Sequence, residues 1–387
     1  MSGVEHFTLS VPDAILSDLR GRLRNARWTD TIDPEGWRNG VNVEYLKTLA
    51  DYWIDAYDWR AHERHINSFP QFQTVLDDTR IHFVHALGSG QQRIPLIITH
   101  GWPGSFLEML KIVPVLCAAK KWRATTWSFD VVVPSIPGFG FSSRPTRPGM
   151  NAWRTADLWA RLMTVLGYER FVVQGGDLGA SIGTALALRH GERVKALHLN
   201  YIPGSYRPPR QDALTAEELA FQRDAMAWYD EEGAYAHLHA TRPQTIGLAL
   251  NDSPIGLTAW LIEKYRAWSD CGGNIETRFS RDEIITHVMI YWLTETIHAS
   301  MRYYREMRQA PMAFAPDDFV AVPVGIARFP AEAPFPPRSW IARGYNIRHW
   351  SEPPHGGHFA AWEEPGLLAG DLEKFITGLG LVEATRL

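Results

Sequence analysis

The central part of the chain alternates between short apolar runs and longer stretches in which apolar residues recur every three or four positions. The short runs have the length of buried strands, and the longer stretches have the period of helices. Strands are predicted at residues 94–99, 129–133, 171–174, 194–199 and 322–327, with His349 near a last strand. Helices are predicted at about 105–116, 152–166, 180–189 and 365–379. This alternation predicts an α/β protein with a mostly parallel, doubly covered sheet.

Two regions depart from this rhythm. The first 90 residues are expected to form a mostly helical leader, with helices near Ile15–Leu23 and 43–57 and a strand at 81–87. Residues from about 203 to 309 are aromatic and helical in pattern, and begin with a predicted capping box from Thr215 to Glu218. We therefore predict a leader at 1–93, a core in two parts at 94–203 and 311–387, and a helical cap at 204–310.

Composition narrows the possible partners. The 387 residues carry a net charge of −4 without long runs of one sign, which argues against a nucleic-acid partner. The longest apolar runs have the length of strands, so no membrane anchor is expected and a cytoplasmic location is predicted. The two cysteines, Cys117 and Cys271, do not have the spacing of a metal or redox motif. The 16 tryptophans suggest an apolar pocket.

The main candidate for chemistry is Asp177, in the segment GGDLG at 175–179. Between a strand and a helix, this glycine pattern is typical of a nucleophile elbow, in which the central side chain is exposed on a strained turn. A plain aspartate that caps the following helix is the alternative. Ser181 is a rival nucleophile, but it lies one turn into the helix and is not flanked by glycines.

Two further segments follow the order expected of an α/β-hydrolase fold. The loop HGWPG at 100–104 would supply the N–H of Trp102 to an oxyanion hole, together with the N–H of Leu178. His358 follows two glycines after the last strand, and Glu332 follows the strand before it. The order of nucleophile, acid and histidine is thus Asp177, Glu332 and His358. Less favoured are His355 as the histidine, Asp317, Asp318 and Glu352 as the acid, and Glu363 and Glu364, which are expected to cap the last helix.

A carboxylate nucleophile limits the reaction. Attack by Asp177 on an alkyl carbon gives an ester, which suits an epoxide or an alkyl halide better than an acyl group. His358, oriented by Glu332, would then activate the water that hydrolyses this ester. An epoxide oxygen needs a hydrogen-bond donor as it leaves, and the cap offers several tyrosines, at positions 229, 235, 265, 291, 303 and 304. A halide often uses a tryptophan beside the nucleophile, where this chain has Leu178.

At this point the sequence resembles the microsomal-type epoxide hydrolase family, which includes the juvenile hormone epoxide hydrolases and soluble bacterial members. The resemblance covers nearly the whole chain. It is carried by ARWTD (26–30), YDWR (57–60), FPQF (69–72), HGWPGSFLE (100–108), PGFGFS (137–142), GGDLG (175–179), NDSPIGL (251–257), IEKYRAW (262–268) and GGHFAAWEEP (356–365).

The resemblance implies Asp177 as nucleophile, with His358 and Glu332, and it adds Tyr235 and Tyr304 as the epoxide-activating acids. Tyr303 is the competitor of Tyr304. The likeness also implies a small-molecule epoxide and water as the only reactants, neither metal nor organic cofactor, and a possible homodimer. Many relatives carry tryptophan at the position of Leu178, so this pocket wall is expected to be wider or more apolar.

The predicted function is therefore conversion of an epoxide and water to a vicinal diol. The alternatives are a haloalkane dehalogenase-like hydrolase and a non-catalytic binding protein of the α/β-hydrolase fold.

Overall fold

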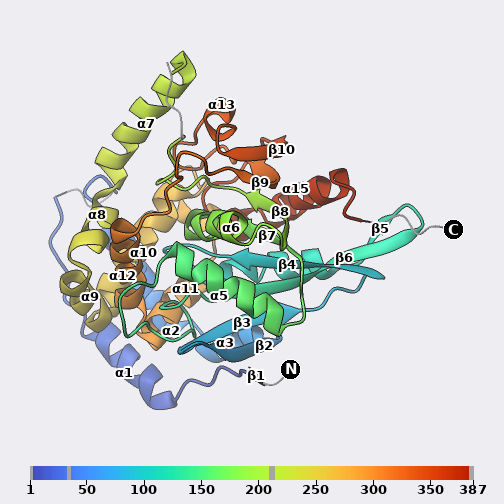
Figure 1. The fold of residues 1–387 in the computed structure, drawn as a ribbon. Coiled ribbons are helices and arrows are strands. Elements are labelled where there is room, and N and C mark those ends of the chain that lie inside the picture. The colour runs from blue at the N-terminus through green and yellow to red at the C-terminus, as the bar shows by residue number, and fades with distance from the viewer. Residues whose placement is uncertain (1–2, 33–35, 209–213, 383–387) are drawn as a thin grey trace.

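The computed structural model describes residues 3–32, 36–208 and 214–382, which form a mixed, mostly parallel sheet with helices around it (Figure 1). The sheet order is β1-β2-β3-β6-β4-β7-β8-β9-β10, and β5 pairs with β6. The strands are β1 (Val4–His6), β2 (Gln71–Leu76), β3 (Thr79–Ala86), β4 (Gln92–Thr99), β5 (Lys120–Trp122), β6 (Thr125–Pro134), β7 (Phe171–Gly175), β8 (Val194–Leu199), β9 (Val320–Ala327) and β10 (Tyr345–Ser351). The pairings from β6 through β4 to β10 are parallel, which confirms the predicted α/β-hydrolase fold.

Two helix pairs accompany this parallel part of the sheet. Helices α5 and α6 pack against each other, and α6 contacts β4, β7, β8 and β9. Helices α4 and α15 form the other pair, with contacts to β6, β9 and β10. The helices of the core are α4 (Ile112–Cys117), α5 (Ala152–Val165), α6 (Asp177–Arg189), α13 (Arg338–Ile341), α14 (Ala360–Glu363) and α15 (Pro365–Gly378), with the 3₁₀ turn η1 (Phe106–Met109).

The single helix predicted at 105–116 is wrong. The structure instead has η1 followed by the short helix α4. Pro114 explains the break, because proline has no N–H to donate and is tolerated only in the first turn of a helix. With α4 starting at Ile112, Pro114 falls in that first turn.

The leader is mostly helical, as predicted, but it also extends the sheet. Its helices are α1 (Asp13–Arg24), α2 (Val43–Asp55) and α3 (Trp59–Asn67). Strands β1, β2 and β3 add an antiparallel edge that joins the parallel part at β6. The sequence reading missed β1, β2 and α3. Strand β2 reads QFQTVL, so its apolar residues are too few to stand out, and a tight turn with Asp77 at a φ of +54° joins it to β3.

The described residues of the cap form helices joined by turns and irregular segments, and the capping box between Thr215 and Glu218 is present. Its helices are α7 (Ala216–Glu232), α8 (Ala234–Thr241), α9 (Pro243–Asp252), α10 (Pro254–Trp268), α11 (Arg281–Thr294) and α12 (Ile297–Gln309), with the 3₁₀ turn η2 (Ile275–Thr277). Helix α12 packs against α8 and α9, whereas α7 projects from the body of the molecule (Figure 1).

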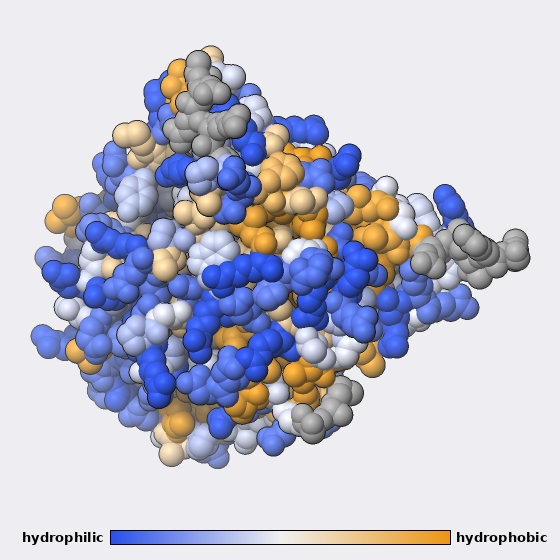
Figure 2. Space-filling view, viewed as in Figure 1, coloured by the Kyte–Doolittle hydropathy of each residue, from blue (hydrophilic) through white to orange (hydrophobic). Residues whose placement is uncertain are grey.

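The surface seen in Figure 2 is a mixture in which polar side chains cover most of the face and apolar groups are scattered among them. Among the described residues, no helix combines the length and the apolar character that a membrane crossing requires.

Candidate active site

Asp177 lies on a strained turn between β7 and α6. Its φ is +47°, a left-handed conformation that residues with a side chain rarely adopt and that often marks functional positions. The flanking glycines permit this turn, because a Cβ on Gly175 would lie 2.3 Å from the carbonyl oxygen of Gly179, and one on Gly179 would lie 2.0 Å from that of Thr99. Helix α6 begins at Asp177 itself rather than at Ala180, so the predicted helix start was three residues late.

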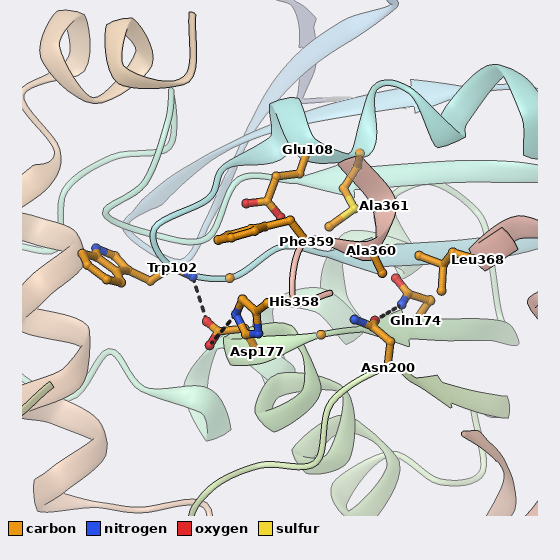
Figure 3. A pocket seen from close by; sticks show the side chains of 13 residues that line it. Trp102, Glu108, Gln174, Asp177, Asn200, His358, Phe359, Ala360, Ala361 and Leu368 are labelled. Carbon is orange, nitrogen blue, oxygen red and sulfur yellow. Dashed lines mark hydrogen bonds and ion pairs between the residues drawn. The ribbon is translucent and has the colours of Figure 1, made fainter. Parts of the chain in front are cut away.

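The loop after β4 brings a hydrogen-bond donor to this carboxylate. The backbone N–H of Trp102 donates to Asp177 Oδ1 over 2.8 Å (Figure 3). Gly101 is needed for this approach, since a Cβ there would lie 2.3 Å from Oδ1. Leu178 lies in the first turn of α6, where backbone N–H groups have no partner within the helix. Of the two predicted oxyanion donors, the N–H of Trp102 contacts Asp177 Oδ1, and the N–H of Leu178 stays a prediction.

His358 and Glu332 lie on the other side of Asp177. His358 Nδ1 is 2.7 Å from Glu332 Oε1, and His358 Nε2 is 3.5 Å from Asp177 Oδ2. The two side chains are almost fully buried, with exposed fractions of 7% and 1%. Glu332 is held by the N–H of Ala333, which donates to the same Oε1 over 2.8 Å. The structure thus brings together the three residues that the sequence order predicts.

The charge on His358 is set by its two carboxylate neighbours. Burial alone would lower the pKa of His358, but the charges of Glu332 and Asp177 and their hydrogen bonds outweigh it and raise the pKa well above its usual value. The two acidic neighbours therefore favour the charged form of His358.

The rival residues lie elsewhere. Ser181 is buried within α6, and His355 is half exposed and pairs with Glu364 at 2.8 Å. Asp318 accepts the N–H of Ala315 before β9 begins, and Glu352 pairs with exposed Arg328. Asp317 also precedes β9, at the opposite end of the strand from Glu332.

The prediction that Glu363 and Glu364 cap the last helix is wrong. Glu364 occupies the position before α15, but its side chain makes no capping hydrogen bond. Instead, Glu363 accepts the N–H groups of Phe359 and Asp270, and Glu364 pairs with Arg278. Both carboxylates therefore hold the loop of His358 rather than a helix end.

Two cap tyrosines lie close enough to Asp177 to interact with its charge. Tyr235 of α8 stacks on the indole of Trp102 with ring centroids 4.9 Å apart, and Tyr304 of α12 meets both rings edge-on. Burial raises the pKa of each hydroxyl well above 10, and the charge of Asp177 adds to this effect. Both phenols are therefore protonated donors at neutral pH.

Tyr303 points elsewhere. Its hydroxyl lies 3.0 Å from the hydroxyl of Thr155 on α5, and its ring packs edge-on against Phe139. Of the two adjacent tyrosines, only Tyr304 is placed against Trp102 and Tyr235.

The comparisons with known proteins agree with this geometry. The family model "Epoxide hydrolase N terminus" matches residues 4–109, and the model "alpha/beta hydrolase fold" matches residues 94–296. The chain is 40% identical to the "Putative epoxide hydrolase" of Stigmatella aurantiaca over 376 residues, which cover 96% of this chain and 84% of that protein. It is 37% identical to epoxide hydrolase 1 of Oryctolagus cuniculus over 413 residues, which cover 98% of this chain and 89% of that protein.

The chain belongs to the epoxide hydrolase family. The solved structure of the Aspergillus niger epoxide hydrolase superposes on this epoxide hydrolase with a TM-score of 0.85 at 34% identity, covering 97% of this chain and 96% of that one. The match extends over the leader and the cap as well as the core, as expected for the microsomal type.

Two of the cap tyrosines that the sequence offers as possible epoxide donors have a different place in this epoxide hydrolase. Tyr265 and Tyr291 of the cap donate their hydroxyl hydrogens to the carbonyl oxygens of Pro103 and Gly104, at 3.0 and 2.7 Å. They therefore fix the loop that carries Trp102. Their prediction would have required knowing that α10 and α11 pack over this loop, because a tyrosine in a helix has no pattern that distinguishes this role.

A second cap segment holds the loop of His358. The N–H of His358 donates to the carbonyl oxygen of Trp268, and the N–H of Gly356 donates to Asp270. Arg278 then pairs with both Asp270 and Glu364, at 2.9 and 2.7 Å. The cap thus positions backbone on both sides of Asp177.

Within the residues that the structure describes, no cluster of three or more histidine, cysteine, aspartate or glutamate side chains is arranged to hold a metal ion.

Proposed function

We propose that this epoxide hydrolase works in two steps through an ester on Asp177. In the first step, Asp177 Oδ2 attacks a ring carbon of the epoxide, and the carbon–oxygen bond of the ring breaks. Tyr235 and Tyr304 donate hydrogen bonds to the oxygen that leaves, and this oxygen becomes a hydroxyl group by taking up the proton that His358 releases. Oδ2 is the attacking atom because Oδ1 already accepts the N–H of Trp102.

In the second step, water attacks the carbonyl carbon of the ester and gives one proton to His358 Nε2. The negative charge that forms on Oδ1 is stabilised by the N–H groups of Trp102 and Leu178. The bond between this carbon and Oδ2 then breaks. Oδ2 takes the remaining proton of the water and leaves with the diol, and the water oxygen stays on Asp177. Asp177 returns to its carboxylate form.

The charges of the site support this order of steps. The negative charge of Asp177 is one of the causes that raise the pKa of His358. Esterification removes that charge, so the pKa of His358 falls when the intermediate forms. His358 is thereby converted from a cation that pairs with the nucleophile into a base for water.

The proposal rests on one observation: the two carboxylate oxygens of Asp177 have different partners. One carboxylate oxygen is 2.8 Å from a backbone N–H, and the other is 3.5 Å from a histidine that is itself held by a buried glutamate. This arrangement suits formation of an alkyl ester and its hydrolysis.

A single-turnover reaction in ¹⁸O-labelled water, with enzyme in excess over styrene oxide, tests the proposal. We expect the diol of the first turnover to be unlabelled and the label to appear in the peptide that contains Asp177. Label that enters the first-turnover diol directly would exclude the ester mechanism.

The finer features of the reaction are also proposals. The aromatic surroundings of Tyr235 favour an aryl or terpenoid-like epoxide. The homodimer and the cytoplasmic location stay predictions from the sequence and its family resemblance.

A further inference from the structure

Glu108 is a buried carboxyl group that the two-step mechanism does not use. It lies in η1, behind the loop of Trp102, and its exposed fraction is 6%. Its Oε1 atom has no hydrogen-bond partner among the described residues. An unpaired oxygen in such a place is costly unless a further group satisfies it, so its position requires an explanation.

The surroundings of Glu108 leave room for a group that could satisfy this oxygen. Glu108 lines a cavity together with Asp177 and His358, and Gln174 and Asn200 line the same cavity. Figure 3 shows Glu108 across from Asp177 and His358, with Gln174 and Asn200 to one side. The cavity volume is about 20 Å³, which is enough for one ordered water molecule.

A second unpaired oxygen lines the same space. The amide nitrogen of Gln174 donates to Asn200 Oδ1 over 2.8 Å, which fixes the orientation of the amide. The Oε1 atom of Gln174 is buried and has no partner among the described side chains and backbone groups. The cavity therefore offers two acceptors beside the catalytic histidine, and an ordered water needs two to four polar partners.

The backbone is shaped to admit the carboxyl group of Glu108. A Cβ on Gly104 would lie 1.1 Å from Glu108 Oε1 and 2.2 Å from its Cδ. The loop thus has no side chain at the place where this carboxyl lies. Tyr291 holds this part of the loop through its hydrogen bond to the Gly104 carbonyl.

We propose that Glu108 binds the water that hydrolyses the ester on Asp177, and that Gln174 Oε1 accepts the second hydrogen of this water until His358 takes it. The inference rests on the two-step mechanism proposed above. Glu108 Oε1 accepts one hydrogen of the water, and the other hydrogen turns from Gln174 Oε1 to His358 Nε2 before the water attacks. The water oxygen then forms its bond to the ester carbon of Asp177, the proton passes to His358, and the Glu108 carboxyl is unchanged at the end of the step.

The charge state of Glu108 is compatible with this role. Burial raises the pKa of Glu108 to about 8, and the neighbouring imidazolium of His358 only partly opposes the shift. The carboxyl is therefore neutral at pH 7 and does not place a third negative charge beside Asp177 and Glu332. A neutral carboxyl retains one oxygen that accepts hydrogen bonds only.

Rapid-mixing kinetics that resolve ester formation from ester hydrolysis test the proposal. Glu108→Met removes the acceptor while keeping a side chain of similar length. We expect ester formation within about twofold of wild type and hydrolysis slowed by about tenfold or more, since one hydrogen bond to the water is lost. The ester then accumulates, and kcat and KM fall together while kcat/KM is kept.

Matched variants separate this role from a structural one. Glu108→Gln retains an acceptor oxygen, so its hydrolysis rate should stay within about threefold of wild type. Gly104→Ala should reproduce the hydrolysis defect of Glu108→Met, because the added methyl group displaces the carboxyl. Gln174→Met should slow the same step less, and it provides the test if Glu108→Met does not fold.

The outcomes are distinct. Unchanged ester hydrolysis in Glu108→Met, or an equal loss in both steps, would overturn the role of Glu108. Equal hydrolysis defects in Glu108→Gln and Glu108→Met would also overturn it. If no ester forms in the wild-type enzyme, the two-step mechanism itself fails, and this result is recognised before any variant is compared.

Discussion

The two sides of the active site are built from different chemistry. The core side contributes charged groups, Asp177, Glu332 and His358, each on a loop that follows a strand. The cap side contributes neutral aromatic donors, Tyr235 and Tyr304, on helices. In the proposed mechanism, the charged groups form and break the covalent bond, whereas the neutral donors meet the leaving oxygen without adding a charge that would compete with Asp177. The difference predicts that core substitutions stop turnover and cap substitutions slow one step of it.

Removal of the nucleophile should have the largest effect. Asp177→Ala is expected to lower kcat by at least about 10⁴-fold, because neither step has another carboxylate to replace it. Steady-state diol formation measures the loss. Ser181→Ala, in the same helix, is the matched control and should keep activity within about threefold. Substantial turnover by Asp177→Ala would contradict the assignment.

Loss of the base should block only the second step. In His358→Gln, ester formation is expected to continue while its hydrolysis falls by about 10³-fold. Intact-protein mass spectrometry should then detect enzyme with one substrate molecule added. A variant that is inactive and yet carries no adduct would show that His358 acts before the ester forms.

On the cap side, the effects should be smaller and confined to the first step. Tyr235→Phe and Tyr304→Phe are each expected to slow ester formation by about 10- to 100-fold, and the double variant by more, because one donor partly replaces the other. Tyr303→Phe, at the position adjacent to Tyr304, is the control. It should lose about 1 kcal/mol of unfolding free energy with its hydrogen bond to Thr155, and retain ester formation.

Substitutions at the contacts between cap and core should lower kcat by a smaller factor than those of the cap tyrosines. Arg278→Gln breaks the pairs with Asp270 and Glu364, and is expected to lower the free energy of unfolding by about 1–3 kcal/mol and kcat by severalfold. Arg281→Gln removes a pair with Glu276 that lies within the cap, so it should leave kcat unchanged. Chemical denaturation and steady-state kinetics of both variants give the comparison. Equal kcat values for the two would mean that the ion pairs of Arg278 do not position the loop of His358.

The smallest effect expected is the pH dependence of stability. Because the folded pKa of His358 is raised, its contribution is fully present below about pH 6.5, the pKa of an unfolded histidine, and is lost as the pH rises towards the folded value. The stability difference between wild type and His358→Gln should therefore shrink from pH 6 to pH 9 in denaturation experiments. A difference that grows over this range would contradict the charge state given to His358.

Local patterns were sufficient for the core but not for contacts made across the fold. The elbow at Asp177, the loop at Trp102 and the order of Glu332 and His358 are encoded in short segments, since each of these segments follows a strand of the sheet. The predicted helix at 105–116 failed because one proline decided its boundaries. Strand β2 was missed because pairing with β3, rather than its own composition, stabilises it.

The positions of the cap residues depend on packing that no local pattern records. Tyr235 and Tyr304 were selected by family resemblance, and the sequence left Tyr303 open until α12 was seen to turn it towards Thr155. Glu108 is part of a motif quoted for the family, yet its burial beside the nucleophile follows only from the lack of a side chain at Gly104.

The leader joins the core sheet through β3 and contacts the cap through its helices. Tyr52 donates to Asp282 and Tyr57 bonds with Thr286, while α1 and α2 pack on α10. A cap transplanted alone from another relative would meet leader helices selected for a different partner. Leader and cap are therefore expected to behave as one inherited unit, and chimeras designed to change substrate range should exchange both together.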